Sequence, residues 1–289
     1  MITRSRQISR INQIVPIIFI LFVISPFFCN AQDIYNTEQS EKYAGYLFSS
    51  QQYELAAEEF ERLVYLDENN IDYKDKLIKS YRLSRDLNKG LKRINSFYGN
   101  SINTIPSNLA KEFIRFNILS DSIIAVESFI LNSNTLSPID KAVSHSCVLL
   151  LKGKYTEAGL FVNTTAEANL PLPSTLIAIT RKAEQVKYKS PLIAAGFSAI
   201  IPGTGKFYTK NWSDGIISMI FVASNAWQAY RGFNEKGAKS VYGWTFASLS
   251  ASFYIGNIFG SAKAARRYNT VKKNEIDNQI FEFIGSDNF

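Results

Sequence analysis

The chain has 289 residues, of which 46% are hydrophobic and 20% are charged, so it can hold one or two domains, each with a core. Its formal net charge of +7 is uneven, because residues 174–289 hold 14 lysines and arginines against 7 acids, whereas residues 33–173 hold 15 against 18. The basic excess lies beside apolar segments, which fits anionic lipid better than nucleic acid. The basic residues are also not interleaved with aromatic residues as in a nucleic-acid module, so nucleic acid is not an expected partner.

Residues 1–31 have the order of a secretory signal peptide. Arginines precede an apolar run that ends at Phe28, and small or polar residues follow from Cys29 to Ala31, so cleavage is expected after Ala31. Lipidation of Cys29 is the alternative, which the large side chain of Phe28 disfavours. After that cleavage Cys147 is the only cysteine, so no disulfide forms within the chain, and we expect Cys147 to be a small core residue.

Residues 37–172 carry a repeat with a period of 34 residues, in a register that starts at positions 37, 71, 105 and 139. The recurring pattern is an aromatic residue, a small residue three positions later and an apolar residue four positions after that: Tyr53, Ala56 and Phe60, then Tyr155, Ala158 and Val162. A period of 34 residues with helix–turn–helix character is typical of the tetratricopeptide repeat.

This segment resembles the tetratricopeptide family closely in its first repeat and more loosely in its second and fourth. The third repeat departs most, because Lys111 and Arg115 occupy expected apolar positions and Asp121 replaces the turn aromatic, so its helices are expected to slip in register. The resemblance implies a curved array in which Ala56 and Ala158 allow two helices to approach closely, and whose concave face binds peptides or partner proteins. The alternative is that the array packs only against the chain's own apolar part.

Residues 174–188 are expected to form a capping or linker helix, and residues 190–210 a hinge. The hinge helix begins at Ser190, and Pro202-Gly203 ends it after a run of apolar and small residues. Eleven residues cover about 16 Å, about half of a bilayer core. We therefore expect a re-entrant or kinked membrane element here.

The hinge sequence Pro202-Gly203-Thr204-Gly205-Lys206 is similar to part of a phosphate-binding loop. That loop requires G-x-x-x-x-G-K-[ST], and here Ile200 stands at the first glycine position and Phe207 at the hydroxyl position. Nucleotide binding is therefore not expected.

Two longer apolar helices are predicted after the hinge, at residues 214–230 and 241–260. The second apolar run is about 28 Å long if helical, which is enough to cross a bilayer core. Its small residues recur at every fourth position, on a face where another helix backbone is expected to approach closely: Ser248, Ser252, Gly256 and Gly260. A buried helical hairpin in a soluble domain is the alternative interpretation.

The tail, residues 269–289, is predicted to be basic and then amphipathic through Ile276, Ile280, Phe281 and Ile284. If the hinge crosses the membrane once, three crossings leave the tail in the cytoplasm, as the positive-inside rule prefers. A re-entrant hinge leaves two crossings and a periplasmic tail. We favour three crossings, because the basic cluster at residues 263–273 then lies inside.

Residues 190–268 form the predicted membrane module, and residues 188–268 resemble a small family of bacterial membrane modules related in style to the two-transmembrane-helix domain family. The shared element is Ser-Ala-x-x-Pro-Gly-x-Gly-x-x-Tyr, followed by an aromatic residue and a glycine. Its motif residues here are Pro202, Gly203, Gly205, Tyr208 and Gly215. Lys206 departs from a more usual glutamine. The resemblance implies membrane placement only.

Taken as a whole, the sequence predicts an all-α protein: a tetratricopeptide-like helical-hairpin solenoid followed by a small transmembrane helical module. His145 is the only histidine and is expected on a repeat helix surface, and no serine–histidine–acid set, metal-ligand cluster or carboxylate pair stands out. We therefore predict no enzyme activity and no catalytic, cofactor or metal site.

The expected role is a non-catalytic protein integral to the inner membrane of the bacterial cell envelope, whose periplasmic repeats scaffold or bind protein partners. The alternative is a component of a membrane transport or secretion assembly. Few ionisable residues lie within the apolar segments, which disfavours a transport path.

Overall fold

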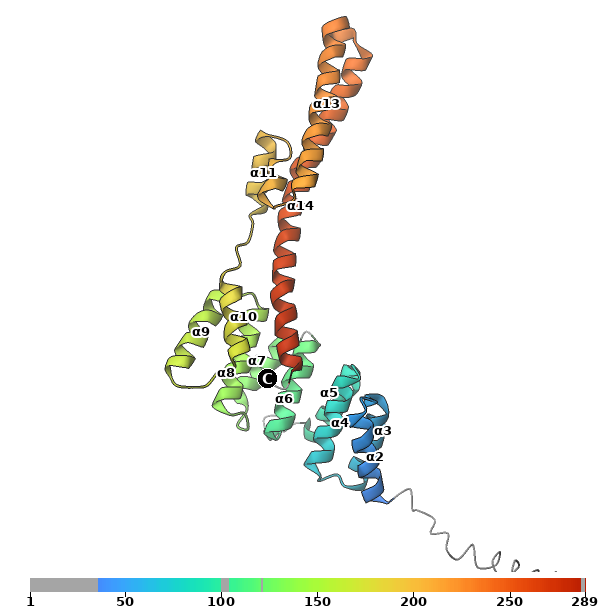
Figure 1. The fold of residues 1–289 in the computed structure, drawn as a ribbon, viewed down its shortest axis with the longest axis vertical. Helices are drawn as coiled ribbons and strands as arrows, with labels where there is room; N and C mark the ends of the chain where they lie inside the picture. Colours follow the sequence, from blue (N-terminus) through green and yellow to red (C-terminus); the bar gives the residue numbers. More distant parts are fainter. Residues whose placement is uncertain (1–35, 100–103, 121, 287–288) are drawn as a thin grey trace, which may run out of the picture. The chain divides into compact units, whose positions relative to one another are not determined.

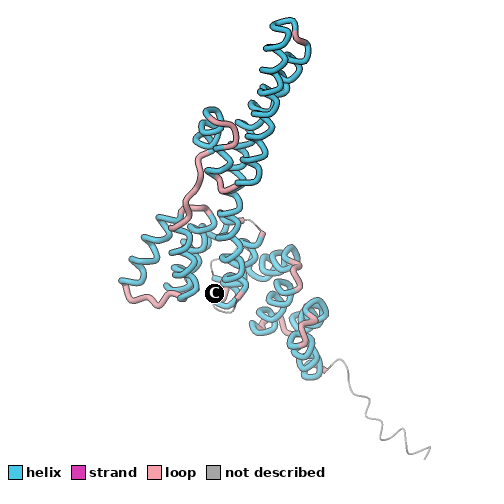
Figure 2. The backbone as a smooth tube through the Cα atoms, turned by 45° about the horizontal axis from the view of Figure 1, so that its top comes forward, coloured by secondary structure: helices cyan, strands magenta, loops and turns pink. Residues whose placement is uncertain are grey.

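The computed structural model describes residues 36–99, 104–120, 122–286 and 289. These residues form thirteen α-helices and no strand, which confirms the predicted all-α class (Figures 1 and 2). The predicted signal peptide and Cys29 lie outside the described residues. The chain divides into two compact units, one ending at Asp86 and the other beginning at Leu87.

The first unit contains α2 (Thr37–Ser49), α3 (Tyr53–Leu66) and α4 (Ile71–Leu83), and each helix packs against the next. Asn36 and Asn70 cap α2 and α4, because each side chain accepts a hydrogen bond from a backbone amide of the first turn. The core between the three helices consists of apolar side chains: Ala44, Leu47, Ala56, Ala57, Phe60, Leu63, Val64, Leu77 and Ile78.

The second unit begins with six shorter helices, each in contact with the next. They are α5 (Leu87–Tyr98), α6 (Ser107–Leu119), α7 (Ile123–Asn132), α8 (Pro138–Leu151), α9 (Tyr155–Glu167) and α10 (Ser174–Glu184). The helices of residues 37–167 start within two residues of the predicted register, and the two-residue slips fall in the third repeat. The helix predicted at 174–188 starts where expected and ends at Glu184.

The hinge and the apolar segments form α11 (Pro191–Ile200), α12 (Thr204–Tyr208), α13 (Trp212–Lys236) and α14 (Val241–Gly285). Ser190 caps α11, as predicted, by accepting from the backbone amide of Ile193 at 3.4 Å. The helices α13 and α14 run side by side as a long hairpin (Figure 1).

Among the described residues, no helix combines the length and the hydrophobicity that a membrane crossing requires. This corrects the prediction that residues 214–230 and 241–260 are transmembrane helices, and with it the three crossings. Both segments are parts of longer helices, and serine, asparagine and glutamine residues along them lower their mean hydropathy.

The predicted boundary between the apolar segment and the tail, at residues 268 and 269, falls inside a continuous helix. The helix α14 runs for 45 residues without a break. Between Ser261 and Gly285 the chain has neither glycine nor proline, so nothing in this part of the sequence ends the helix. One helix therefore joins the hairpin to the C-terminal residues.

Candidate functional site

The C-terminal half of α14 packs against α6, α8 and α10 (Figure 1). Its buried face consists of Ile276, Ile280, Phe283 and Ile284, so the predicted amphipathic stripe is correct except at Phe281, which is 37% exposed. The three contacted helices alternate along the chain with α7 and α9. The tail therefore covers one side of this part of the helical array.

Arg115 on α6 binds the end of α14. Its Nε and Nη2 atoms donate to the carbonyl oxygens of Ile284 and Ser286, both at 2.9 Å, and Nη1 donates to the buried Glu112 carboxylate. Its guanidinium group also lies 5.2 Å from the ring centre of Phe289. The last carbonyls of a helix carry partial negative charge, so a cation stabilises this end of α14. Contact with the tail therefore explains why a charged residue, Arg115, stands where the repeat pattern predicts an apolar one.

A lysine makes a second polar contact between the tail and the array. Lys273 on α14 donates to the carbonyl oxygen of Leu151, the last residue of α8, at 3.1 Å. The same ammonium group pairs with Asp277 one turn later on α14. Like Arg115, this side chain meets the carbonyl end of a helix.

The residues predicted to pack the repeats lie at helix contacts. Ala56, Phe60 and Ala158 are fully buried, and the half-buried Tyr53 meets the ring of Phe48 edge-on at 5.6 Å. Tyr155 is also buried and stacks on Tyr188, whose hydroxyl donates to the Tyr155 oxygen at 3.1 Å. Burial is the main reason that the pKa of Tyr155 is raised, and the hydrogen bond from Tyr188 adds to it.

Two glycines of the hinge motif stand where a side chain has no room. A Cβ atom on Gly205 would lie 1.8 Å from the carbonyl oxygen of Ala194, and one on Gly203 would lie 2.3 Å from that of Gly215. Gly203 also has a φ of 93°, a left-handed conformation that glycine adopts without strain. The backbone of α12 therefore approaches α11 and α13 closely.

Hydrogen bonds hold this glycine motif to α14. The hydroxyl of Ser198 accepts from the Gly205 amide at 3.0 Å and shares a hydrogen bond of 2.7 Å with Ser261. Lys206 donates to Ser218 on α13 at 2.7 Å. These contacts are those of a packed helix junction.

Tyr208, the last residue of α12, anchors the chain before the hinge. Its hydroxyl accepts from the Ser190 amide at 3.3 Å, and the Lys189 ammonium lies 4.4 Å from its ring centre. Asn269 of α14 pairs with the backbone of Lys189 through two hydrogen bonds of 2.7 and 2.9 Å. Pro202 lies in the turn between α11 and α12, so the five motif residues cluster at this junction.

The hairpin of α13 and α14 has small residues inside and large apolar residues outside. The buried residues of α13 are Gly215, Val222, Ala229 and Gly232, and on α14 Gly243 and Asn257 are buried in the hairpin. Ser250 of α14 donates to the carbonyl oxygen of Val222 at 3.1 Å across it. The outward side chains on α13 are between 49% and 62% exposed: Ile216, Ile217, Ile220, Phe221, Trp227 and Tyr230. On α14 the exposed side chains include Val241, Leu249, Phe253, Ile255 and Phe259. This order is the reverse of that in a water-soluble protein.

A spacing of seven residues recurs among these positions, and Gly232, three residues after Ala229, also meets Gly243 closely. Spacings of three and seven residues are those of helices that pack nearly parallel or antiparallel over a long contact. The predicted contact face was therefore wrong: Ser248, Ser252 and Gly256 are exposed, and Gly260 is half-buried beside Lys206. Asn257 lies in the hairpin with 5% exposure, and neither side-chain polar atom has a partner in the described structure.

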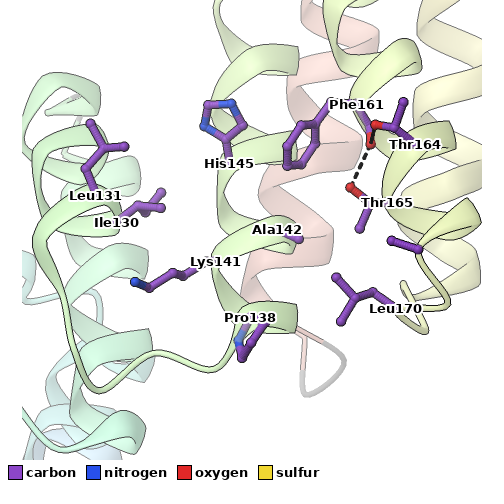
Figure 3. A pocket seen from close by; sticks show the side chains of 11 residues that line it. Ile130, Leu131, Pro138, Lys141, Ala142, His145, Phe161, Thr164, Thr165 and Leu170 are labelled. Atoms are coloured by element: carbon purple, nitrogen blue, oxygen red, sulfur yellow. Dashed lines mark hydrogen bonds between the residues drawn. The ribbon is translucent and has the colours of Figure 1, made fainter.

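A pocket of about 610 Å³ lies between α7, α8 and α9 (Figure 3). The ring of His145 meets that of Phe161 edge-on at 4.8 Å, and His145 is half-buried on a helix of the array. Lys141 and His145 are its ionisable lining residues, and the lining has no carboxylate or thiol. The hydroxyl of Thr165 in this lining donates to the backbone oxygen of Phe161 at 2.7 Å, within its own helix.

No group of three or more His, Cys, Asp or Glu side chains that could hold a metal ion occurs in the part of the chain that the structure describes. Cys147 is fully buried, and burial raises the pKa of its thiol. A buried neutral thiol is a weak nucleophile, so its position is that of a core residue.

The chain matches no known family model, and no curated protein or solved structure matches it. The two family resemblances therefore stay predictions, and the candidate functional site is defined by geometry alone. It is the exposed apolar surface of α11 and the α13–α14 hairpin. The lack of charge predicted these segments, but the spacing of their small residues did not predict which large side chains turn outward.

Proposed function

We propose that this chain is a non-catalytic protein anchored to a membrane of the bacterial cell envelope, in which the hairpin contacts lipid and tetratricopeptide-like repeats in the periplasm bind protein partners. The observation that carries this proposal is the hairpin with small residues inside and large apolar residues outside. Full burial of an isoleucine or phenylalanine contributes about 1.5–3 kcal/mol, and these side chains, about half exposed, forgo roughly half of it in water. Contact with lipid acyl chains recovers that free energy.

The charges around the hairpin support lipid as the occupant of its surface. Residues 215–230 and 240–262 contain no charged residue, and Lys210, Arg231, Lys239 and Lys263 lie near the ends of these stretches. Cations beside apolar surface are attracted to anionic headgroups. The exposed rings of Trp212, Trp227, Tyr230, Tyr242 and Trp244 suit the boundary between headgroups and acyl chains.

The first unit is the part of the repeats that we expect to bind a partner, because the tail already covers one side of α6, α8 and α10. Residues 37–86 contain 11 acids against 7 lysines and arginines. Tyr43, Tyr46 and Tyr65 are more than half exposed there. This combination favours a basic protein partner that contributes apolar side chains.

Flotation of the purified full chain with phosphatidylcholine vesicles tests the lipid contact. The chain should float, and Ile216→Ser with Ile220→Ser should weaken its partitioning by about tenfold per residue, since each change removes apolar area from the lipid contact. Ile124→Ser with Leu131→Ser is the matched control, because both side chains are more exposed but lie on α7. Equal flotation of both variants, or a wild-type chain that stays in solution as an oligomer covering this surface, would contradict the proposal.

A further inference from the structure

The turn between α13 and α14 contains a pocket of about 460 Å³. Its lining includes Arg231, Glu235, Lys236 and Lys239, so three cations face one carboxylate. Arg231 and Glu235 lie 3.9 Å apart as an exposed pair. In the described structure, no ion-pair partner accompanies Lys236 or Lys239, which leaves the pocket with a positive charge.

The backbone around this pocket is held in one shape. The indole of Trp244 donates to the carbonyl oxygen of Ala238 at 3.0 Å, and Ser240 caps α14 by accepting from the Gly243 amide at 3.0 Å. A Cβ atom on Gly232 would lie 2.7 Å from the Gly243 backbone nitrogen, so the two helices meet closely just below the turn. The two lysines are therefore carried on a fixed turn.

An acceptor in the same lining lacks a donor. The side-chain oxygen of Gln228 is buried and has no hydrogen-bond partner in the described structure. A hydroxyl group of a bound molecule can supply that donor. The pocket thus combines two lysines that suit a phosphate with an acceptor that suits a hydroxyl.

We propose that this pocket binds the headgroup of an anionic phospholipid that carries both a phosphate and hydroxyl groups, such as phosphatidylglycerol. The inference rests on the proposed lipid contact of the hairpin and adds the lipid class to it. Lys236 and Lys239 bind the phosphate, and Gln228 accepts from a headgroup hydroxyl. The acyl chains lie against the adjoining apolar surface, where Val241 is 80% exposed. That surface favours a lipid over free phosphate.

Flotation of the full chain with phosphatidylcholine vesicles and with phosphatidylcholine–phosphatidylglycerol vesicles tests the pocket. Lys236→Gln with Lys239→Gln should lower partitioning to the anionic vesicles by about thirtyfold. Each lysine beside an anionic surface strengthens the binding by about 1 kcal/mol, which is less than about tenfold. The same variant should bind phosphatidylcholine like the wild type. Lys92→Gln with Lys141→Gln is the control. It removes the same charge from α5 and α8, and its partitioning to anionic vesicles should change little.

The outcomes separate the two proposals. A chain that floats with neither kind of vesicle contradicts the lipid contact itself and, with it, this site. If the wild-type chain floats equally with both kinds of vesicle, or if the two double variants lose the same amount of partitioning to anionic vesicles, the lipid contact stands and the headgroup pocket is contradicted. Inorganic phosphate at matched ionic strength should not displace the chain from anionic vesicles, and displacement would assign the pocket to free phosphate.

Discussion

At the scale of single residues, the positions that depart from the repeat pattern carry the most information. Ala56, Phe60 and Ala158 follow the pattern, and their burial could be predicted because local spacing alone places them between paired helices. Arg115 could not be explained in this way. Its acceptor on Ile284 lies 169 residues away, and no local pattern reports so distant a contact.

Arg115→Ala should destabilise the second unit by about 3–5 kcal/mol, because it removes the cation that accompanies a buried carboxylate and binds the end of α14. Urea unfolding followed by circular dichroism measures this change. Lys111→Ala is the control, since its ion pair with Asp140 leaves the lysine one-third exposed and should be worth less than about 1 kcal/mol. Similar losses in the two variants would contradict the role given to Arg115.

At the scale of elements, the hinge could be predicted and the hairpin contact could not. Pro202-Gly203 ends α11 as expected, because proline and glycine act on the local backbone. The contact face of α14 depends on its partner helix. The small residues at every fourth position of α14 predicted one contact face. In the structure, Gly243, Ser250 and Asn257 lie on the side of α14 that packs in the hairpin instead.

Gly205→Ala should destabilise the junction of α11 and α12 by about 1–3 kcal/mol, because the new methyl group would overlap a backbone oxygen that cannot rotate away. Gly196→Ala is the control, since a Cβ atom there meets nothing within 4 Å. That change should stabilise α11 by about 0.5–1 kcal/mol. Thermal unfolding in detergent measures both variants, and a tolerated Gly205→Ala would show that α12 does not approach α11 closely.

The tail contact belongs to the same scale. Ile280→Ala should cost about 2–5 kcal/mol, because its side chain is fully buried between α14 and the array. Phe281→Ala, on the more exposed side of the same turn, should cost much less. Limited proteolysis should cut the C-terminal half of α14 faster in Ile280→Ala than in Phe281→Ala. Equal cutting rates would indicate that the tail does not rest on the array.

At the scale of the whole molecule, composition and period were enough to predict an all-α chain and where most helices begin. They were not enough to predict that one helix, α14, serves both the hairpin and the array. That arrangement depends on a stretch after Gly260 with no glycine or proline before Gly285 and on distant apolar contacts at Ile276 to Ile284. The absence of charge predicted the apolar segments, but no described helix has the length and hydropathy that a membrane crossing requires.

The central claim is that the outward face of the hairpin contacts lipid, and tryptophan fluorescence tests it most directly. The chain has three tryptophans, Trp212, Trp227 and Trp244, and all three lie on the hairpin with exposures of 58% to 62%. On mixing the full chain with vesicles whose acyl chains are brominated, we predict a blue shift, strong quenching by bromine and protection from aqueous iodide. An unshifted spectrum with full iodide quenching and no bromine quenching would contradict the account.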